Sequence, residues 1–68
     1  MPFINIRIVK EAIADDPAGK KASIAADVTA AIQKATGLSE NDVWVVFDEA
    51  PAADWYVGKT SVAERRRS

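Results

Sequence analysis

Residues 1–9 read MPFINIRIV, and the rest of the chain is organised around this segment. Its side chains alternate between the two faces of an expected strand over residues 3–9. The two faces carry Ile4, Ile6 and Ile8 on one side, and Phe3, Asn5, Arg7 and Val9 on the other. Both faces are partly apolar, which indicates a strand covered by a helix on one side and by a partner subunit on the other.

Pro2 adds a reactive group to this stretch. Because proline is a small second residue, an aminopeptidase can remove Met1 and leave a free secondary amine. An α-amino group has a pKa of about 8 in a peptide, and desolvation in an apolar pocket lowers that pKa toward the range in which a proton shuttle works best. The competing interpretation is a proline at a strand end, where its missing N–H is harmless.

The 68 residues include no cysteine and no histidine, and we expect them to form one domain over 1–68. A domain this small buries only about 60% of its unfolded surface and usually needs disulfides, a metal or oligomerisation. We therefore expect a homo-oligomer with no metal and no cofactor. A catalyst without imidazole or thiolate must use carboxylates, lysines, Tyr56, hydroxyls or the amino terminus.

Charge and hydropathy limit the classes of partner that the chain is expected to bind. A net charge of −1 argues against a general nucleic-acid binder, although the three arginines at 65–67 make the end of the chain locally basic. No apolar run approaches the roughly 20 residues that span a membrane. Charged residues from Lys10 to Asp16 interrupt any secretory signal, so we expect a cytoplasmic protein that binds neither nucleic acid nor membrane.

A long helix is predicted over residues 17–36. Asp16 and Pro17 form a helix start, with an N-cap carboxylate followed by proline at the first helical position, and Gly37 is the expected stop. The predicted apolar face consists of Ile24, Val28, Ala31 and Ala35, widened by Ala25 and Ile32. Residues 10–15 before the helix are expected to form a loop, and residues 39–42 after it resemble a capping box on a single turn.

A second strand is predicted over residues 43–49, rich in β-branched and aromatic side chains. Two strands joined by one long helix make an α/β (α+β) fold, a βαβ unit with parallel strands. The adjacent Asp48 and Glu49 should point to opposite faces and form no acid–base pair. Residues 55–57 are expected to form a short C-terminal extended segment before a turn at 58–59, and residues from Ser61 onward an arm that frays or lies on a neighbouring subunit.

These features together resemble the 4-oxalocrotonate tautomerase family over essentially the whole chain. The features are Pro2 directly after Met1, a β-branched first strand, one long helix, a second strand ending in Phe47-Asp48-Glu49, and the later Trp55-Tyr56-Val57-Gly58. The resemblance implies a βαβ subunit in a hexamer, typically a trimer of dimers, with Pro2 as general base. It also implies an isomerase that converts enols or dienols of 2-keto acids into conjugated ketones, while cationic side chains hold the carboxylates of the small-molecule substrate.

The sequence lacks counterparts of two arginines in the family pattern. The family's arginine shortly after the first strand has no counterpart in residues 10–16, where Lys10 is the nearest cation. A second family arginine falls by position on Trp44, which carries no charge. The family's pocket aromatic matches Trp55, an apolar wall that would lower the pKa of the Pro2 amine. We therefore expect a tautomerase-like site whose substrate is not the standard dicarboxylic dienol.

Each remaining site residue has two interpretations. Lys10 either binds a carboxylate or is a solvated loop lysine. Arg7 either reaches a neighbour's pocket or forms an ion pair inside the oligomer, and the ion pair is favoured. Trp44 either packs at an interface or lines the pocket. The leading hypothesis is a keto–enol tautomerase; the alternatives are a hydratase or dehalogenase acting on an unsaturated acid, and an inactive structural or ligand-binding oligomer.

Overall fold

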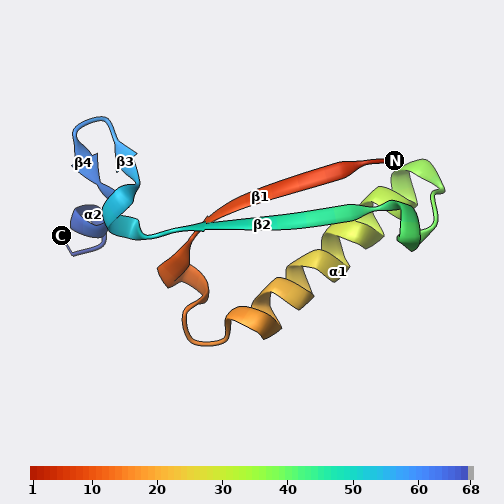
Figure 1. The fold of residues 1–68 in the computed structure, drawn as a ribbon, viewed down its shortest axis with the longest axis horizontal. Coiled ribbons are helices and arrows are strands. Elements are labelled where there is room, and N and C mark those ends of the chain that lie inside the picture. Colours follow the sequence, from red (N-terminus) through yellow and green to blue (C-terminus); the bar gives the residue numbers. More distant parts are fainter. Residues whose placement is uncertain (68) are drawn as a thin grey trace.

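The computed structural model describes residues 1–67. Figure 1 shows two long strands lying side by side, one long helix across one face of them, and a small hairpin with a short helix at the far end. In chain order the elements are β1 (Phe3–Val9), the 3-10 helix η1 (Lys10–Ile13), α1 (Pro17–Thr36), the 3-10 helix η2 (Glu40–Asp42), β2 (Trp44–Ala50), the 3-10 helix η3 (Ala52–Asp54), β3 (Tyr56–Val57), β4 (Thr60–Ser61) and α2 (Val62–Arg67).

The strands β1 and β2 pair in parallel, which confirms the predicted βαβ unit. Their register runs from Phe3 opposite Trp44 to Val9 opposite Ala50. The second strand therefore lies one residue later at each end than the predicted 43–49. Because facing residues share a side of the sheet, Arg7 and its partner Asp48 lie on the same face.

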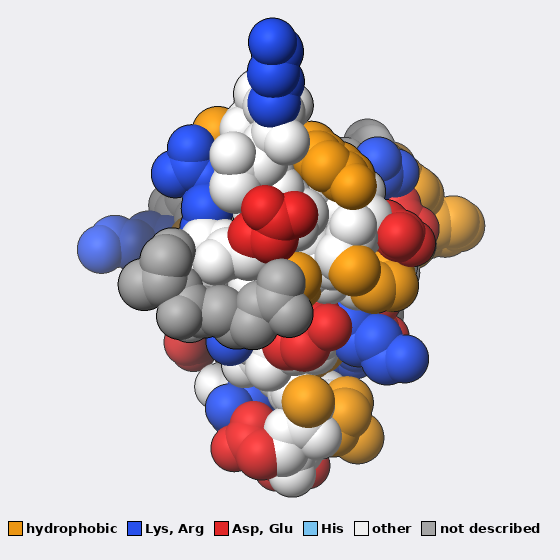
Figure 2. Space-filling view, turned by 90° about the vertical axis from the view of Figure 1, so that its left-hand side faces the viewer, with side chains coloured by type: hydrophobic (Ala, Val, Ile, Leu, Met, Phe, Trp, Pro, Cys, Tyr) orange, Lys and Arg blue, Asp and Glu red, His pale blue; other side chains and the backbone are white. Residues whose placement is uncertain are grey.

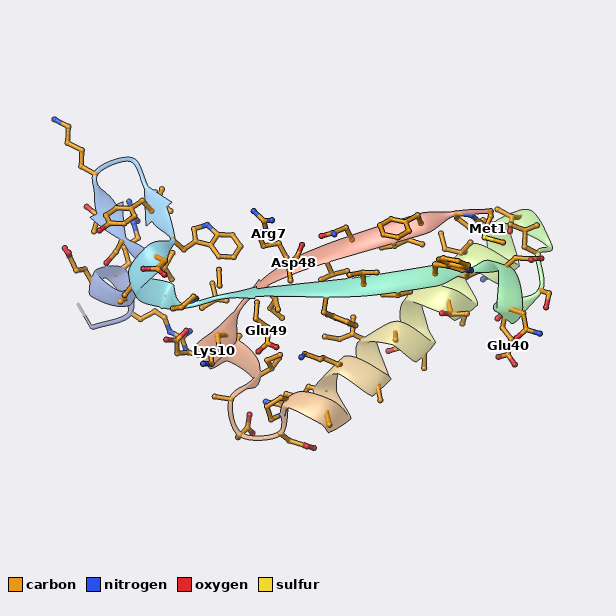
Figure 3. The ribbon with its side chains drawn as sticks, in the orientation of Figure 1. Met1, Arg7, Lys10, Glu40, Asp48 and Glu49 are labelled. Atoms are coloured by element: carbon orange, nitrogen blue, oxygen red, sulfur yellow. The ribbon has the colours of Figure 1, made fainter. Side chains whose placement is uncertain are left out.

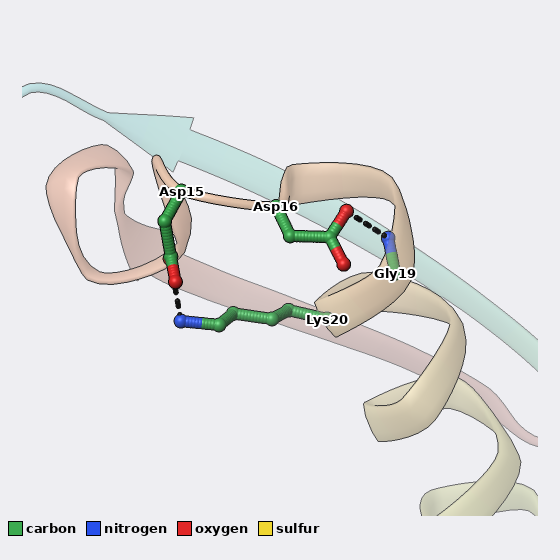
Figure 4. A network of polar contacts seen from close by, with 4 residues as sticks. All are labelled: Asp15, Asp16, Gly19 and Lys20. Atoms are coloured by element: carbon green, nitrogen blue, oxygen red, sulfur yellow. Dashed lines mark hydrogen bonds and ion pairs between the residues drawn. The ribbon is translucent and has the colours of Figure 1, made fainter.

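The predicted helix bounds are confirmed at both ends. Asp16 is the N-cap, and its side chain accepts a hydrogen bond from the backbone N–H of Gly19 at 3.2 Å, while Lys20 reaches back to Asp15 at 2.6 Å (Figure 4). At the other end Gly37 adopts the left-handed conformation, with φ 76°, and its N–H donates to the carbonyl of Gln33. These caps satisfy backbone groups that the helix itself leaves unpaired.

The face that α1 turns toward the sheet differs from the predicted one. Ile24, Val28 and Ile32 are half-buried, whereas Ala31 and Ala35 are exposed. The contact follows one i, i+4 row of the helix surface, and the two alanines lie to the side of that row. The prediction was therefore right for the larger residues and wrong for these alanines.

The segments before and after the helix match the prediction only in part. Residues 10–13, part of the expected loop, form η1 and bury Ile13 almost completely. After the helix, η2 is the predicted single turn, but the Ser39 hydroxyl accepts from the N–H of Asn41 at 3.3 Å. A capping box would instead use the N–H of the third residue of the turn, so the expected box is absent from this turn.

The segment after β2 forms a compact unit of its own. Strands β3 and β4 pair in an antiparallel hairpin, and α2 follows directly and contacts η3. The N–H of Val62 donates to the carbonyl of Trp55 at 2.7 Å, which ties α2 to the start of the hairpin. The fraying arm is therefore wrong, because residues 62–67 form a helix that contacts η3, whereas contact of this segment with a neighbouring subunit stays a prediction; Ser68 lies outside the described residues.

The single chain is elongated and has little core. Its radius of gyration is 14.8 Å, against about 11 Å for a globular chain of this length. Only Ile13 and Ala52, which are 3% and 2% exposed, are buried hydrophobic residues in the part of the chain that the structure describes. The sheet face opposite α1 exposes Phe3, Trp44 and Val46 by 61%, 53% and 40%. No helix within residues 1–67 is long and apolar enough to cross a membrane.

Candidate functional site

Pro2 lies at the end of the sheet where β1 begins. The backbone N–H of Trp44 donates to the carbonyl oxygen of Pro2 at 3.1 Å, and Trp44 is paired with Phe3 in the strand register. Pro2 is half-buried, and Met1 before it is 78% exposed. The amino end of the chain is therefore held against β2 at a fixed position, beside the exposed aromatic rings of Phe3 and Trp44.

A cavity of about 320 Å³ lies at the other end of the sheet. It is lined by Arg7, Ala50, Asp54, Trp55 and Tyr56. The strands contribute Arg7 and Ala50 from the face that α1 leaves uncovered, and the segment from η3 to β3 contributes the rest. Figure 2 views the molecule from the end that carries β3, β4 and α2, where acidic and basic side chains are interspersed with apolar ones.

Backbone contacts hold the aromatic wall of the cavity in place. The Glu11 carboxylate accepts a hydrogen bond from the N–H of Ala52 at 2.9 Å, which attaches η3 to η1. This backbone N–H favours the charged form and lowers the pKa of Glu11 below its ordinary value, with smaller contributions from Arg66 and Lys10. Ala52 itself is 2% exposed, so the turn that presents Asp54 and Trp55 is anchored in the small core.

Two ion pairs lie on opposite faces of β2. Arg7 and Asp48 approach to 3.6 Å on the uncovered face, and Lys21 of α1 binds Glu49 at 2.5 Å on the helix side. Figure 3 shows Asp48 and Glu49 pointing away from each other, as predicted for adjacent strand residues. Arg7 forms an ion pair within its own chain and also lines this cavity, while its reach into a neighbouring subunit's pocket stays a prediction.

Lys10 is placed differently from Arg7. It opens η1, is exposed, and does not belong to the residues that line the cavity. Figure 3 shows it on the other side of β2 from Arg7. The geometry therefore favours the solvated interpretation of Lys10 in the isolated chain and makes Arg7 the cation of this cavity.

The predicted site residues fall into two groups. Pro2 and Trp44 lie at one end of the sheet, and Arg7 and Trp55 at the other, with Met1 and Arg7 well separated in Figure 3. Five strand residues at ~3.3 Å each place Pro2 roughly 16 Å from Arg7. Within one chain, therefore, Trp55 does not form a wall around the Pro2 amine.

Sequence reasoning missed Asp54 as a residue of the cavity. It directly precedes Trp55, the aromatic residue that matches the family pattern. This position in the same short loop was the one feature of the sequence that could have indicated Asp54 as a residue of the cavity. Within residues 1–67 no group of three or more acidic side chains is arranged to hold a metal ion.

Comparisons with known proteins agree with this architecture. A family model described as "Tautomerase enzyme" matches residues 2–65. Probable tautomerase K2 of Dickeya dadantii (strain 3937) is 36% identical over 67 residues, which cover 98% of this chain and 96% of that protein.

Two crystal structures share the fold. One is TomN, described as a 4-oxalocrotonate tautomerase homologue in the tomaymycin biosynthetic pathway, with 31% identity, a TM-score of 0.84, and coverage of 98% of this chain and 97% of that one. The other is DmpI from Helicobacter pylori, with 25% identity, a TM-score of 0.85, and coverage of 98% of both chains.

Proposed function

Because this chain belongs to the tautomerase family, we propose that it interconverts the enol and keto forms of a 2-keto acid or related carbonyl compound, with Pro2 as general base. Family membership supports tautomerase or isomerase activity, and the residue-level mechanism is our proposal. The observation that carries it is the place of Pro2, since the family match begins at this residue and its carbonyl is fixed to β2.

The proposed chemistry needs Met1 to be removed. The freed secondary amine of Pro2 takes the proton from the enol oxygen and returns a proton to carbon, so the double bond moves and no other reactant is consumed. An apolar wall around the amine disfavours its protonated form and keeps it basic yet unprotonated near neutral pH. Neither step requires a cofactor.

The two groups of site residues come together when a second copy supplies one of them. Pro2 and the cavity lie at opposite ends of one sheet, and the uncovered face between them exposes Phe3, Trp44 and Val46. In a two-fold pairing with antiparallel sheets, the same patch of each copy meets the other. Pro2 of each copy then lies at the cavity of its partner, and Trp55 becomes the apolar wall of the partner's amine. We propose a homo-oligomer of this kind, with the hexamer as its full assembly.

Two measurements test the role of Pro2. Intact mass should show a chain without Met1, because a retained Met1 acylates the proline nitrogen and abolishes the base. Pro2→Ala should lower kcat/KM for ketonisation of phenylenolpyruvate at least ~100-fold, the usual contribution of a general base. Pro17→Ala, at the first turn of α1, is the matched control and should keep normal activity. Unchanged ketonisation by Pro2→Ala contradicts the proposal.

Mixing two inactive variants tests whether the site is shared. Pro2→Ala and Arg7→Ala are each expected to be poorly active as pure oligomers. If one copy supplies Pro2 and another Arg7, randomly mixed oligomers regain about a quarter of their sites, each with both residues intact. Failure to regain activity after unfolding and refolding the two together, while wild type treated alike recovers, argues against a shared site.

One observation bears on the hydratase alternative. Asp54 is a carboxylate in the cavity, where it can orient a water molecule. That reaction also needs a pair of arginines, and Arg7 is the one arginine lining this cavity among the described residues. Tautomerisation, which needs only one proton-transfer group and one carboxylate anchor, therefore fits the cavity better.

A further inference from the structure

The cavity that completes the proposed site has an unusual balance of charge for a site that binds an acid. Its lining contains one cation, Arg7, and one carboxylate, Asp54, beside the rings of Trp55 and Tyr56. A second carboxylate, Asp48, lies 3.6 Å from Arg7. These three charged groups together carry one positive and two negative charges, so the described part of this chain supplies the cavity with no second cation for another carboxylate of a ligand.

Arg7 still retains the capacity to hold one carboxylate. A hydrogen-bonded pair of guanidinium and carboxylate is about 2.7–2.9 Å apart, so the 3.6 Å separation from Asp48 is an ion pair without a close hydrogen bond. The Arg7 side chain is 68% exposed, and a guanidinium carries five N–H donors in a planar fork. Asp48 therefore orients Arg7, while its remaining donors can bind a planar carboxylate.

Asp54 is held where a ligand can meet it. It ends η3, and its own N–H donates to the carbonyl of Pro51 at 2.9 Å. The first residue of η3, Ala52, is fixed by Glu11. These bonds fix the backbone that carries the Asp54 side chain. A carboxylate at this position accepts hydrogen bonds and repels other anions, so it favours a ligand with a hydroxyl or amino donor there and disfavours a ligand with a second carboxylate.

We propose that this cavity selects a planar monocarboxylate that carries a hydroxyl or amino donor in addition to the reacting enol hydroxyl: the carboxylate binds Arg7, the ring or conjugated body lies against Trp55 and Tyr56, and the additional donor binds Asp54. This assignment rests on the proposed tautomerase function, which it narrows from acids in general to hydroxylated or aminated monocarboxylic enols.

The kinetic test compares three enols: 4-hydroxyphenylenolpyruvate, phenylenolpyruvate and the dicarboxylic 2-hydroxymuconate. In the wild-type oligomer kcat/KM should be about tenfold higher for the hydroxylated acid than for phenylenolpyruvate, and lowest for the dicarboxylate. Asp54→Ala should remove the preference for the hydroxyl group and raise kcat/KM for the dicarboxylate about tenfold relative to that for phenylenolpyruvate. Asp27→Ala, an exposed acid on α1, is the control and should change none of these values.

A binding test separates this inference from the proposed function. Calorimetry with the non-reacting acids 3-(4-hydroxyphenyl)propanoate, 3-phenylpropanoate and adipate should give the same order of affinity, and Asp54→Ala should abolish it. If Pro2→Ala stays active but this order holds, the proposed base is wrong and the ligand class stands. If wild type prefers the dicarboxylates, or Asp54→Ala weakens all three acids equally, the ligand class is overturned while the Pro2 test remains independent.

Discussion

The backbone N–H of Trp44 donates to the carbonyl oxygen of Pro2, so the hydrogen bonding between β1 and β2 continues beyond Phe3 to the proposed base. The bond does not depend on the indole ring. Only proline at position 44 removes the donor, and Val43 before it is already extended, with φ −100° and ψ 117°, as a residue before proline must be.

Trp44→Pro is therefore predicted to loosen the amino end of the chain without breaking the sheet. A typical hydrogen bond contributes about 1 kcal/mol, so we expect kcat to fall by about fivefold to tenfold. Trp44→Ala, which also loses the ring but keeps the N–H, is the control for the side chain. Equal kcat values for the two variants would show that this bond does not position Pro2.

The two lysine–carboxylate pairs at the start of α1 provide a matched comparison. Lys21 binds Glu49 of β2 with both side chains about one-third exposed, at 31% and 32%, whereas Lys20 binds Asp15 at nearly the same distance with exposures of 42% and 75%. The first pair joins helix to sheet, and the second joins the helix to the loop before it. Burial reduces solvent screening, so the Lys21–Glu49 pair should contribute more.

We predict a coupling energy of about 1 kcal/mol for Lys21 and Glu49 and a clearly smaller one for the exposed pair of Lys20 and Asp15. Double-mutant cycles with Lys→Met and the amide variants Glu49→Gln and Asp15→Asn measure both, by urea unfolding at one fixed protein concentration. A larger coupling for the exposed pair would mean that burial does not set the strength of these contacts.

Gly37 is the helix end at which a side chain should be costly. Its φ of 76° is left-handed, and a β-carbon there would meet no atom within 4 Å, so the cost arises from the backbone alone. Gly37→Ala should lower the free energy of unfolding by about 1–2 kcal/mol, and Gly37→Asn by less. Urea unfolding of the three proteins tests this order; equal stabilities would indicate that the helix end rearranges.

The sequence predicted the βαβ unit well because its signals are local. Asp16, Pro17 and Gly37 mark the helix ends through backbone chemistry within a few residues, and the isoleucines of β1 carry a strict alternation. In the C-terminal unit the extended segment at 55–57 and the turn at 58–59 were predicted, but α2 was missed because it has no strong pattern of its own and depends on its contact with η3. A tertiary contact of this kind leaves no periodic hydrophobic pattern in a helix of only six residues.

The candidate site was predictable by residue type and in part by arrangement. Pro2 and Trp55 match the family pattern, and Arg7 was named from its place on the first strand. Because the two strands were predicted to be parallel, Pro2 before the first and Trp55 after the second belong at opposite ends of one sheet, as the structure places them. Asp54 was missed because a lone aspartate in a loop is usually a solvated turn residue. It lines the cavity only because Glu11, distant in sequence, holds η3.

The bond from Ala52 to Glu11 makes the cavity wall sensitive to acid. The backbone N–H lowers the pKa of Glu11 in the folded chain. The stability that this bond contributes is therefore fully present above pH 4.5, the ordinary pKa of glutamate. The contribution is lost as pH falls through the lowered folded pKa.

In a Trp44→Phe background, Trp55 is the only tryptophan, and its fluorescence should change with a midpoint below pH 4.5. Glu11→Gln keeps a neutral acceptor for the same N–H, so its Trp55 signal should be flat over that range. The same transition in Glu11→Gln would assign the change to another carboxyl group. Asp15 would then be the next residue to replace, because its hydrogen bond with Lys20 lowers its pKa as well.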